Sequence, residues 1–385
     1  MEDQFDSSLV GRENSTLEKV ASVIYIVLSV FIVPVNLMVI GTVVSLKSLR
    51  VPTNWFVCSL SVADLLIGAV VIPFDIICII DPAITSSKGF CIIGLSLSHA
   101  MGIASIVNLI GLTVDRCVAI KWPLRYQSIV TGKFTAIIIA IQWIFAVLYG
   151  FAPAMGWNNI DDETELIRCE PVLITTVEYS MVVIFVVIVP TLTFVSVIFY
   201  ITLAAANRQM KRIEATTVSA DQIEPNINRN QRKNFRITKT LFALVIITYI
   251  FWLPFAIVCE VRKIAFHWDN LDEDGIIHTY HLHLLLSIFA YLSALINPIV
   301  YSYGNRDLKR AIKKKLWKLH CCKRQNSTQV ASVQMDGLPM NTADSPTCIE
   351  VSIATTLSGV ASDTKETLDK EVQSCNPENE VEQTL

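Results

Sequence analysis

Charged side chains are scarce in this 385-residue chain: Asp, Glu, Lys and Arg make up 17% of it, against 52% hydrophobic residues. Soluble globular domains carry about a quarter charged residues, so this composition excludes an ordinary soluble protein. The formal net charge of −3 says little, because it averages basic segments with an acidic tail. The ten cysteines lie mostly within apolar runs, which does not fit a disulfide-rich secreted scaffold.

The sequence also lacks features that other classes of membrane protein require. A rhomboid-type membrane protease needs a Gly-x-Ser-Gly serine, and the sequence contains no such tetrapeptide. A retinal-binding pump needs a lysine in its last span, and residues 276–305 contain none. Transporters are usually built from internal repeats, which are not seen here. We therefore expect neither an enzyme nor a transporter. The acidic, polar N-terminal residues do not fit a secretory signal peptide, so we expect the first span to act as its own insertion signal.

Long uncharged windows dominate what is present. Gly89–Val114 has 26 residues without Asp, Glu, Lys or Arg, enough to cross a hydrocarbon core of about 30 Å as a helix. The second window is interrupted only by Asp64 and Asp75. The sequence therefore predicts an all-α membrane protein, a seven-transmembrane helix bundle over residues 20–303. The seven windows are Val20–Leu46, Val51–Ile80, Gly89–Val114, Phe134–Trp157, Tyr179–Asn207, Thr240–Cys259 and Ile276–Asn305.

The charges of the connecting loops predict the orientation. Lys and Arg gather in the first, third and fifth connections and after the last window, whereas Asp and Glu gather in the others. The positive-inside rule then places the N-terminus (residues 1–19) outside the cell and the C-terminus in the cytoplasm. We expect a multi-pass protein of the plasma membrane. Asn14 begins an Asn-Ser-Thr sequon that would lie outside and would be glycosylated.

The segment after the last window predicts a membrane-surface element. Residues 304–322 place apolar side chains on one helical face among lysines and arginines, as in an amphipathic helix on anionic membrane lipids. Cys321 and Cys322 follow it and are placed for palmitoylation, the alternative being two unmodified thiols. Residues 323–385 are polar and acidic, and we expect a disordered cytoplasmic tail. Its serines and threonines suit receptor kinases and arrestin, or are simply those of a soluble tail.

One polar group lies deep in the second window. Membrane carboxylates at the depth of Asp64 usually face the bundle interior and bind an ion, a proton or water. Asn36, Ser105 and Asn297 lie at mid-span as well and would complete a polar cluster, with a sodium ion near Asp64 as its candidate occupant. The alternative is a protonated aspartic acid in a hydrogen-bonded knot. No other metal or cofactor is expected.

The outer part of the bundle has its own candidates. Asp75, if it faces inward, gives an outer cavity a negative charge, with Ser98, His99 and Tyr291 at similar depth. The alternative is an interfacial carboxylate that reaches water. Trp252, two residues before a proline that would form a hinge, is placed to sense what fills the cavity. The alternative is an aromatic side chain that only packs within its span.

The two ends of the third window carry distinct signals. Cys91 has one obvious partner, Cys169, the only cysteine in the next exterior loop, where the compartment favours disulfides. At the other end, Asp115 and Arg116 form an adjacent acid and base that either act as a polar device or merely end the helix.

These marks together resemble the rhodopsin-like (class A) G-protein-coupled receptors over residues 20–322. They include the Asp-Arg-Cys stretch at Asp115, the Phe-Trp-Leu-Pro stretch around Trp252, and Asn-Pro-Ile-Val-Tyr from Asn297 through Pro298 to Tyr301. The resemblance implies an extracellular small-molecule ligand and a heterotrimeric G protein as partner. It implies that Asp115, Arg116, Asn297, Pro298 and Tyr301 serve activation and G-protein coupling. Nucleic acid is not an expected partner.

Within that family the chain is most similar to the adenosine receptors, on stretches such as Met-Gly-Trp-Asn-Asn after the fourth window. The resemblance implies a receptor for adenosine or a related nucleoside, with cyclic AMP signalling. Cys259 stands where those receptors place the asparagine that grips adenine, Tyr291 where they place a ribose-contacting histidine, and Asp75 where they have a small residue. The alternative is therefore a receptor for a biogenic amine or another small ligand, orphan or constitutively active, on an adenosine-receptor-like scaffold. The expected ligand-binding residues are Asp75, Ser98, His99, Trp252, Cys259 and Tyr291.

Overall fold

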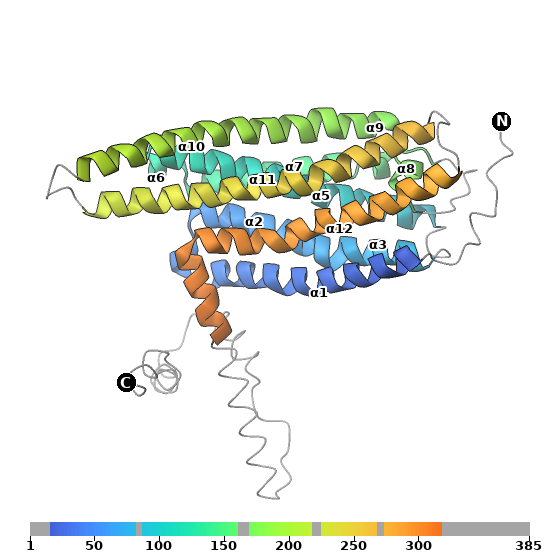
Figure 1. Ribbon diagram of the computed structural model, residues 1–385, viewed down its shortest axis with the longest axis horizontal. Helices are drawn as coiled ribbons and strands as arrows, with labels where there is room; N and C mark the ends of the chain where they lie inside the picture. Colours follow the sequence, from blue (N-terminus) through green and yellow to red (C-terminus); the bar gives the residue numbers. More distant parts are fainter. Residues whose placement is uncertain (1–15, 82–86, 161–168, 218–224, 268–272, 318–385) are drawn as a thin grey trace, which may run out of the picture. The chain divides into compact units, whose positions relative to one another are not determined.

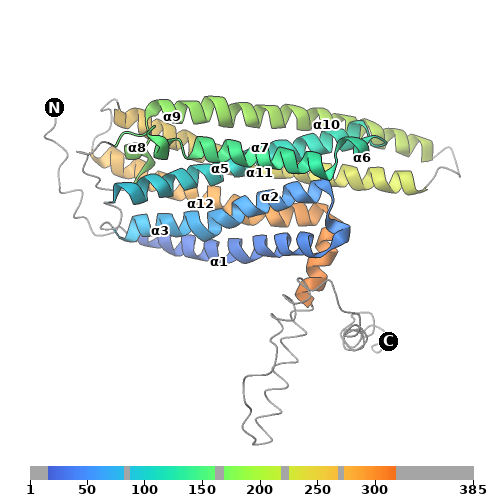
Figure 2. The ribbon, with the colours of Figure 1, turned by 180° about the vertical axis from the view of Figure 1, so that it is seen from behind.

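A computed structural model describes residues 16–81, 87–160, 169–217, 225–267 and 273–317. It contains seven helices long and apolar enough to cross a membrane among these residues. They run side by side as one bundle (Figures 1 and 2). The spanning elements are α1 (Thr16–Ser45), α2 (Pro52–Leu66) continued by η3 (Ile67–Val71) and α3 (Ile72–Ile80), α5 (Lys88–Lys121), α7 (Gly132–Gly150), α9 (Val177–Val182) continued by η5 (Val183–Ile188) and α10 (Val189–Thr217), α11 (Pro225–His267), and α12 (Glu273–Gly304).

Short elements connect the spans: η2 (Lys47–Leu49), α6 (Tyr126–Ile129), η4 (Pro153–Met155) and α8 (Pro171–Ile174). The chain divides into two units, residues 1–306 and 307–385. The bundle belongs to the first. In the second, the described residues 307–317 are helical. They alternate Leu308, Ile312 and Leu316 with lysines and arginines, as the amphipathic pattern predicts.

The predicted fold class is confirmed, and the helix ends differ from the uncharged windows. The third span continues to Lys121 and the sixth helix runs over Pro225–His267, because charged residues can prolong a helix once it leaves the apolar region. The fourth helix instead ends at Gly150, before the predicted end at Trp157. The chain turns there through η4 and through Gly156, whose φ of 107° suits a residue without a side chain.

The internal prolines act in two ways. Pro34, Pro254 and Pro298 lie inside continuous α-helices. Pro73 and Pro190 instead lie just after the π-helical stretches η3 and η5. Proline removes a backbone donor, and the wider turn of a π-helix rotates the residues that follow relative to a regular helix. The faces that α3 and α10 present to their neighbours are therefore set partly by these wide turns.

The third span, α5, is the centre of the bundle. Of its apolar window 56% is buried, against 17% for α7, which lies at the periphery. Close helix approaches depend on glycine: a Cβ on Gly150 would stand 2.3 Å from the Cα of Ala100. Large apolar side chains on the outward faces remain exposed, as expected of surfaces that face lipid. Examples are Val30, Phe31, Ile137, Ile144 and Phe185.

Candidate functional site

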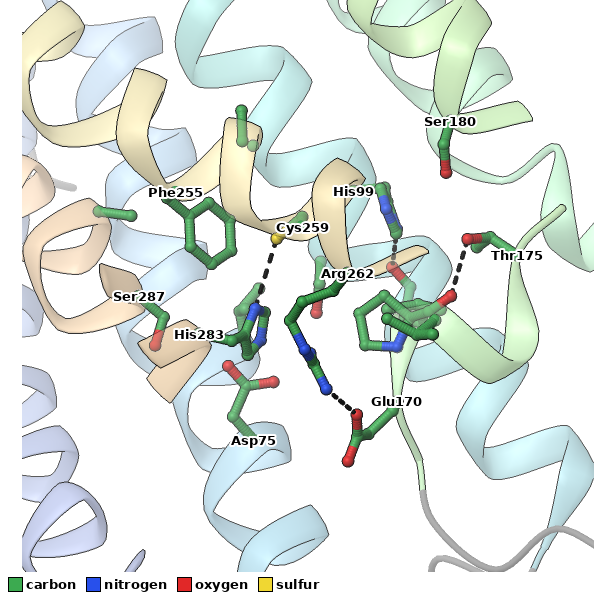
Figure 3. Close-up of a pocket in the computed structure, with 18 of the residues that line it drawn as sticks. Asp75, His99, Glu170, Thr175, Ser180, Phe255, Cys259, Arg262, His283 and Ser287 are labelled. Carbon is green, nitrogen blue, oxygen red and sulfur yellow. Dashed lines mark hydrogen bonds and ion pairs between the residues drawn. The ribbon is translucent and has the colours of Figure 1, made fainter. Parts of the chain in front are cut away.

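A cavity of about 220 Å³ lies within the end of the bundle that holds Cys91. Its walls come from α1, the second span (η3 and α3), α5, α8, the fifth span (α9 and η5), α11 and α12. Figure 3 shows part of this lining. All six predicted ligand-binding residues line it, among them Asp75, His99 and Cys259. Its surface is mainly apolar with a few polar groups, the usual character of a small-molecule site.

A disulfide fixes one wall of the cavity. Cys91 on α5 is bonded to Cys169, with Cα atoms 5.3 Å apart. Because Glu170 and α8 follow Cys169 directly, the link holds this connecting segment against α5. Ile174 of α8 packs beside Cys91 and Leu95 and is fully buried. The segment therefore forms a wall of the cavity.

Asp75 lines the cavity and accepts a hydrogen bond from the phenol of Tyr291. The ring of Tyr291 meets that of Tyr25 edge-on, with centroids 5.5 Å apart. The hydroxyl of Tyr25 lies 2.5 Å from the hydroxyl of Ser287. Two hydrogen-bonded pairs, linked by this ring contact, therefore join α1, α3 and α12 around the carboxylate.

Ser98 and His99 also line the cavity, but their polar atoms turn to their own helix. The hydroxyl of Ser98 donates to the carbonyl oxygen of Gly94 at 3.0 Å. Nδ1 of His99 lies 2.9 Å from the carbonyl oxygen of Leu95. The imidazole of His99 packs edge-on against Tyr179.

Trp252 reaches the cavity from α11. Its Nε1 donates to the Ser293 hydroxyl at 3.0 Å, which ties α11 to α12. A Cβ on Gly102 would stand 3.2 Å from the indole, so the ring lies directly on the α5 backbone. Anything that enters the cavity to this depth meets the indole.

A charged cluster at the end of α11 was not predicted. Arg262 forms an ion pair with Glu170 at 2.8 Å, as Figure 3 shows. The buried Lys263 donates to the hydroxyl of Thr175, to the carbonyl oxygen of Thr176 and to the hydroxyl of Ser180. The uncharged window ended at Cys259, but the helix continues beyond it. A signal was present, because residues 262 and 263 continue the helical face of residues 252, 255 and 259.

His283 was missed as well. Its Nδ1 lies 3.4 Å from the Sγ of Cys259, so the cysteine joins α11 to α12 at the level of the cavity (Figure 3). Its imidazole also packs against Phe255, with ring centroids 5.2 Å apart. No motif or charge in the sequence links Cys259 to His283 in the next span.

The predicted mid-span cluster lies around Asp64, which is fully buried. Its two oxygens accept hydrogen bonds from Ser105 at 3.3 Å and from Asn297 at 2.9 Å, joining α2, α5 and α12. Asn36 instead donates to the carbonyl oxygen of Ala294 and so ties α1 to α12. Within the described residues, the Oδ1 atoms of Asn36 and Asn297 have no hydrogen-bond partner. Such oxygen donors suit a hard cation.

A second polar device lies at the opposite end of α5. The Arg116 guanidinium pairs with Asp115, with Nη2 to Oδ2 at 2.5 Å and Nε to Oδ2 at 2.9 Å. Both side chains are almost fully buried. Thr53 on α2 donates to Asp115 at 2.8 Å and accepts from Arg116. The pair is therefore part of a network between two helices and does more than end one.

Tyr126 completes this network from the loop helix α6. Its hydroxyl donates to Oδ1 of Asp115 at 2.6 Å. Burial, followed by the negative charge of Asp115, raises the pKa of this phenol to about 12. It therefore stays protonated and remains a donor across the physiological range. Neither Thr53 nor Tyr126 was predicted, because both contacts cross between segments.

Further contacts lie on the same half of the bundle. The Tyr301 hydroxyl is 2.5 Å from that of Ser61, which places the end of the Asn-Pro motif beside α2. Arg236 on α11 donates to the carbonyl oxygen of Tyr303 on α12 at 2.9 Å. Gln209 on α10 donates to the carbonyl oxygen of Ile120 on α5 at 2.8 Å. These bonds hold α10, α11 and α12 to their neighbours here. The predicted modification sites Asn14, Cys321 and Cys322, and the tail 323–385, lie outside the described residues.

Comparison with known proteins agrees with this arrangement. The family described as 7 transmembrane receptor (rhodopsin family) matches residues 35–301. The chain is 30% identical to adenosine receptor A2b of Canis lupus familiaris over 295 residues, which cover 71% of this chain and 82% of that one. It is 26% identical to adenosine receptor A2a of Homo sapiens over 328 residues, 80% of this chain and 74% of that one. With its seven spans and a match over most of its length, the chain belongs to the rhodopsin family of seven-transmembrane receptors, which are signalling receptors and not enzymes.

Proposed function

We propose that this receptor binds adenosine or a related nucleoside at the Cys91 end of the bundle and activates heterotrimeric G proteins from the Arg116 end. The nucleoside assignment is supported by similarity, over 71% to 80% of the chain, to receptors named for adenosine. The cavity supplies an enclosed apolar site with polar groups for such a ligand. Loop charges favour the Cys91 end as extracellular and the plasma membrane as the location.

The mechanism rests on one observation: the single helix α11 reaches from the cavity to the opposite end of the bundle, where Arg116 lies. Trp252 and Cys259 of α11 line the cavity, and Arg236 of the same helix binds α12 at the opposite end. A ligand that favours one position of Trp252 would shift the population toward one arrangement of α11. Movement about Pro254 would then open a crevice near Arg116. The intact Asp115–Arg116 ion pair then belongs to the inactive arrangement of the helices.

A cationic amine is the second candidate, and Asp75 is the reason. Among the described residues the carboxylate accepts only from the neutral phenol of Tyr291. No described lysine or arginine is paired with it, so a ligand ammonium could take that place.

The deciding experiment is a cyclic AMP assay in cells that express the chain, challenged with adenosine and with a panel of biogenic amines. We expect a response to adenosine that survives Asp75→Asn. A response to an amine alone, lost in Asp75→Asn, would replace the nucleoside assignment. A sodium ion near Asp64, palmitoylation, glycosylation, and capture of the tail by receptor kinases and arrestin remain predictions that the family makes plausible.

A further inference from the structure

One oxygen of a carboxylate in the cavity wall lacks a hydrogen-bond partner. Glu260 lies on α11 and lines the cavity between Cys259 and the charged cluster. Its Oε2 atom is buried and has no hydrogen-bond partner within the part of the chain that the structure describes. A buried acceptor without a donor is unfavourable, so the position is suited to a group that arrives with the ligand.

The charge of Glu260 is partly offset by a neighbouring cation. Lys263 lies three residues further along the same helix, on the neighbouring face, and its ammonium interacts with the carboxylate. Ser180 on α9 interacts with Glu260 and accepts from Lys263 at 2.8 Å. Lys263 directs its hydrogen bonds to Thr175, Thr176 and Ser180, so the lysine does not donate to Oε2.

This arrangement selects the kind of group that binds. A ligand anion at Oε2 would be repelled by Glu260, and the ammonium of Lys263 offsets the attraction that the carboxylate would exert on a second cation. A neutral N–H or O–H donor satisfies the open oxygen and adds no charge. The neighbouring wall includes Phe255 and His283, whose rings offer packing surface to a flat ligand.

We propose that Glu260 is a ligand-binding residue that accepts a hydrogen bond from a neutral donor of the ligand, which for a nucleoside is the exocyclic amino group of the base. This inference rests on the nucleoside function proposed above. Glu260 and Lys263 would then favour nucleosides whose base carries a hydrogen-bond donor at that edge over nucleosides whose base carries an acceptor there. A base with a carbonyl oxygen at that edge would place an acceptor against the carboxylate.

The first test uses the unmodified receptor and three nucleosides in a cyclic AMP assay. Adenosine carries the amino group, inosine carries a carbonyl oxygen there, and N6,N6-dimethyladenosine has no N–H to donate. Loss of a hydrogen bond to a charged group predicts potencies for inosine and dimethyladenosine about tenfold or more below that of adenosine. Equal potency of the three would overturn the inference.

The second test uses Glu260→Gln, whose amide can donate to the inosine oxygen. The adenosine-to-inosine potency ratio should fall about tenfold in this variant, at surface levels measured in parallel. Glu178→Gln is the matched control, because this exposed carboxylate on α9 does not line the cavity and its neutralisation should leave the ratio unchanged.

The outcomes separate the two proposals. An unchanged ratio in Glu260→Gln, with a normal adenosine response of the unmodified receptor, overturns the role of Glu260 alone. No response of the unmodified receptor to any of the three nucleosides overturns the nucleoside function and this inference with it. If Glu260→Gln does not reach the surface, the three nucleosides on the unmodified receptor still decide.

Discussion

Replacement of Tyr126 by phenylalanine is the sharpest perturbation of the cytoplasmic switch. The phenol donates to Oδ1 of Asp115 at 2.6 Å, and Asp115 holds Arg116 through its other oxygen. The substitution removes one oxygen atom and leaves the ring in place. It therefore weakens the resting network without opening a large cavity.

The expected size follows from the bond that is lost. A hydrogen bond to a charged group contributes about 1.5–3 kcal/mol, and the lower figure applies because Tyr126 is only partly buried. A loss of about 1.5 kcal/mol changes a two-state equilibrium roughly tenfold. If about 1% of the ligand-free receptor is active, Tyr126→Phe should raise this to about 10%.

The assay is ligand-independent nucleotide exchange on G proteins in membranes, normalised to receptor number. Tyr200→Phe is the control, because its side chain is 73% exposed on the outside of α10 and its loss should leave basal exchange unchanged. Because burial raises the pKa of Tyr126 from 10.0 to about 12, its contribution is complete below pH 10 and is lost only as the pH rises through about 12. The increase should therefore be the same at pH 6.5 and 8. No rise in basal exchange would refute the resting-state role of the network.

Three further predictions test the scaffold and the cavity. Gly150→Ala should lower the melting temperature in detergent by several degrees, because its Cβ would stand 2.3 Å from the Ala100 backbone, whereas Gly132→Ala meets nothing within 4 Å and should not. Cys169→Ser should reduce adenosine potency about tenfold or more, and a reducing agent should do the same to the unmodified receptor but add nothing to the variant. Sodium chloride, compared with choline chloride, should lower agonist affinity in the unmodified receptor and have no effect in Asp64→Asn; an equal effect in both would exclude a sodium site there.

The sequence was sufficient for the bundle because the bilayer imposes a simple rule. Each span needs a long apolar window, and charge marks its limits. The same rule explains the errors at the ends, since α11 continues beyond Cys259 into Arg262 and Lys263, where charge is tolerated. A charge-free window therefore underestimates a helix and hides the residues at the mouth of a cavity.

Contacts between segments were harder to predict. Ser105 and Asn297 could be assigned to Asp64 because all three lie at mid-span depth in separate windows. Thr53 and Tyr126 could not be assigned to Asp115, because one begins a helix and the other lies in a loop. The wide turns η3 and η5 also rotate the helices that follow, and an ideal helical period does not contain this rotation.

We propose that occupation of the cavity at the Cys91 end drives G-protein activation at the Arg116 end. The most direct measurement is nucleotide exchange on a panel of purified heterotrimeric G proteins by the receptor reconstituted in lipid, with and without adenosine. We expect faster exchange on at least one G protein with adenosine, and loss of that increase in Trp252→Ala at unchanged receptor level. No acceleration by adenosine on any member of the panel, or an equal increase in Trp252→Ala, would contradict it.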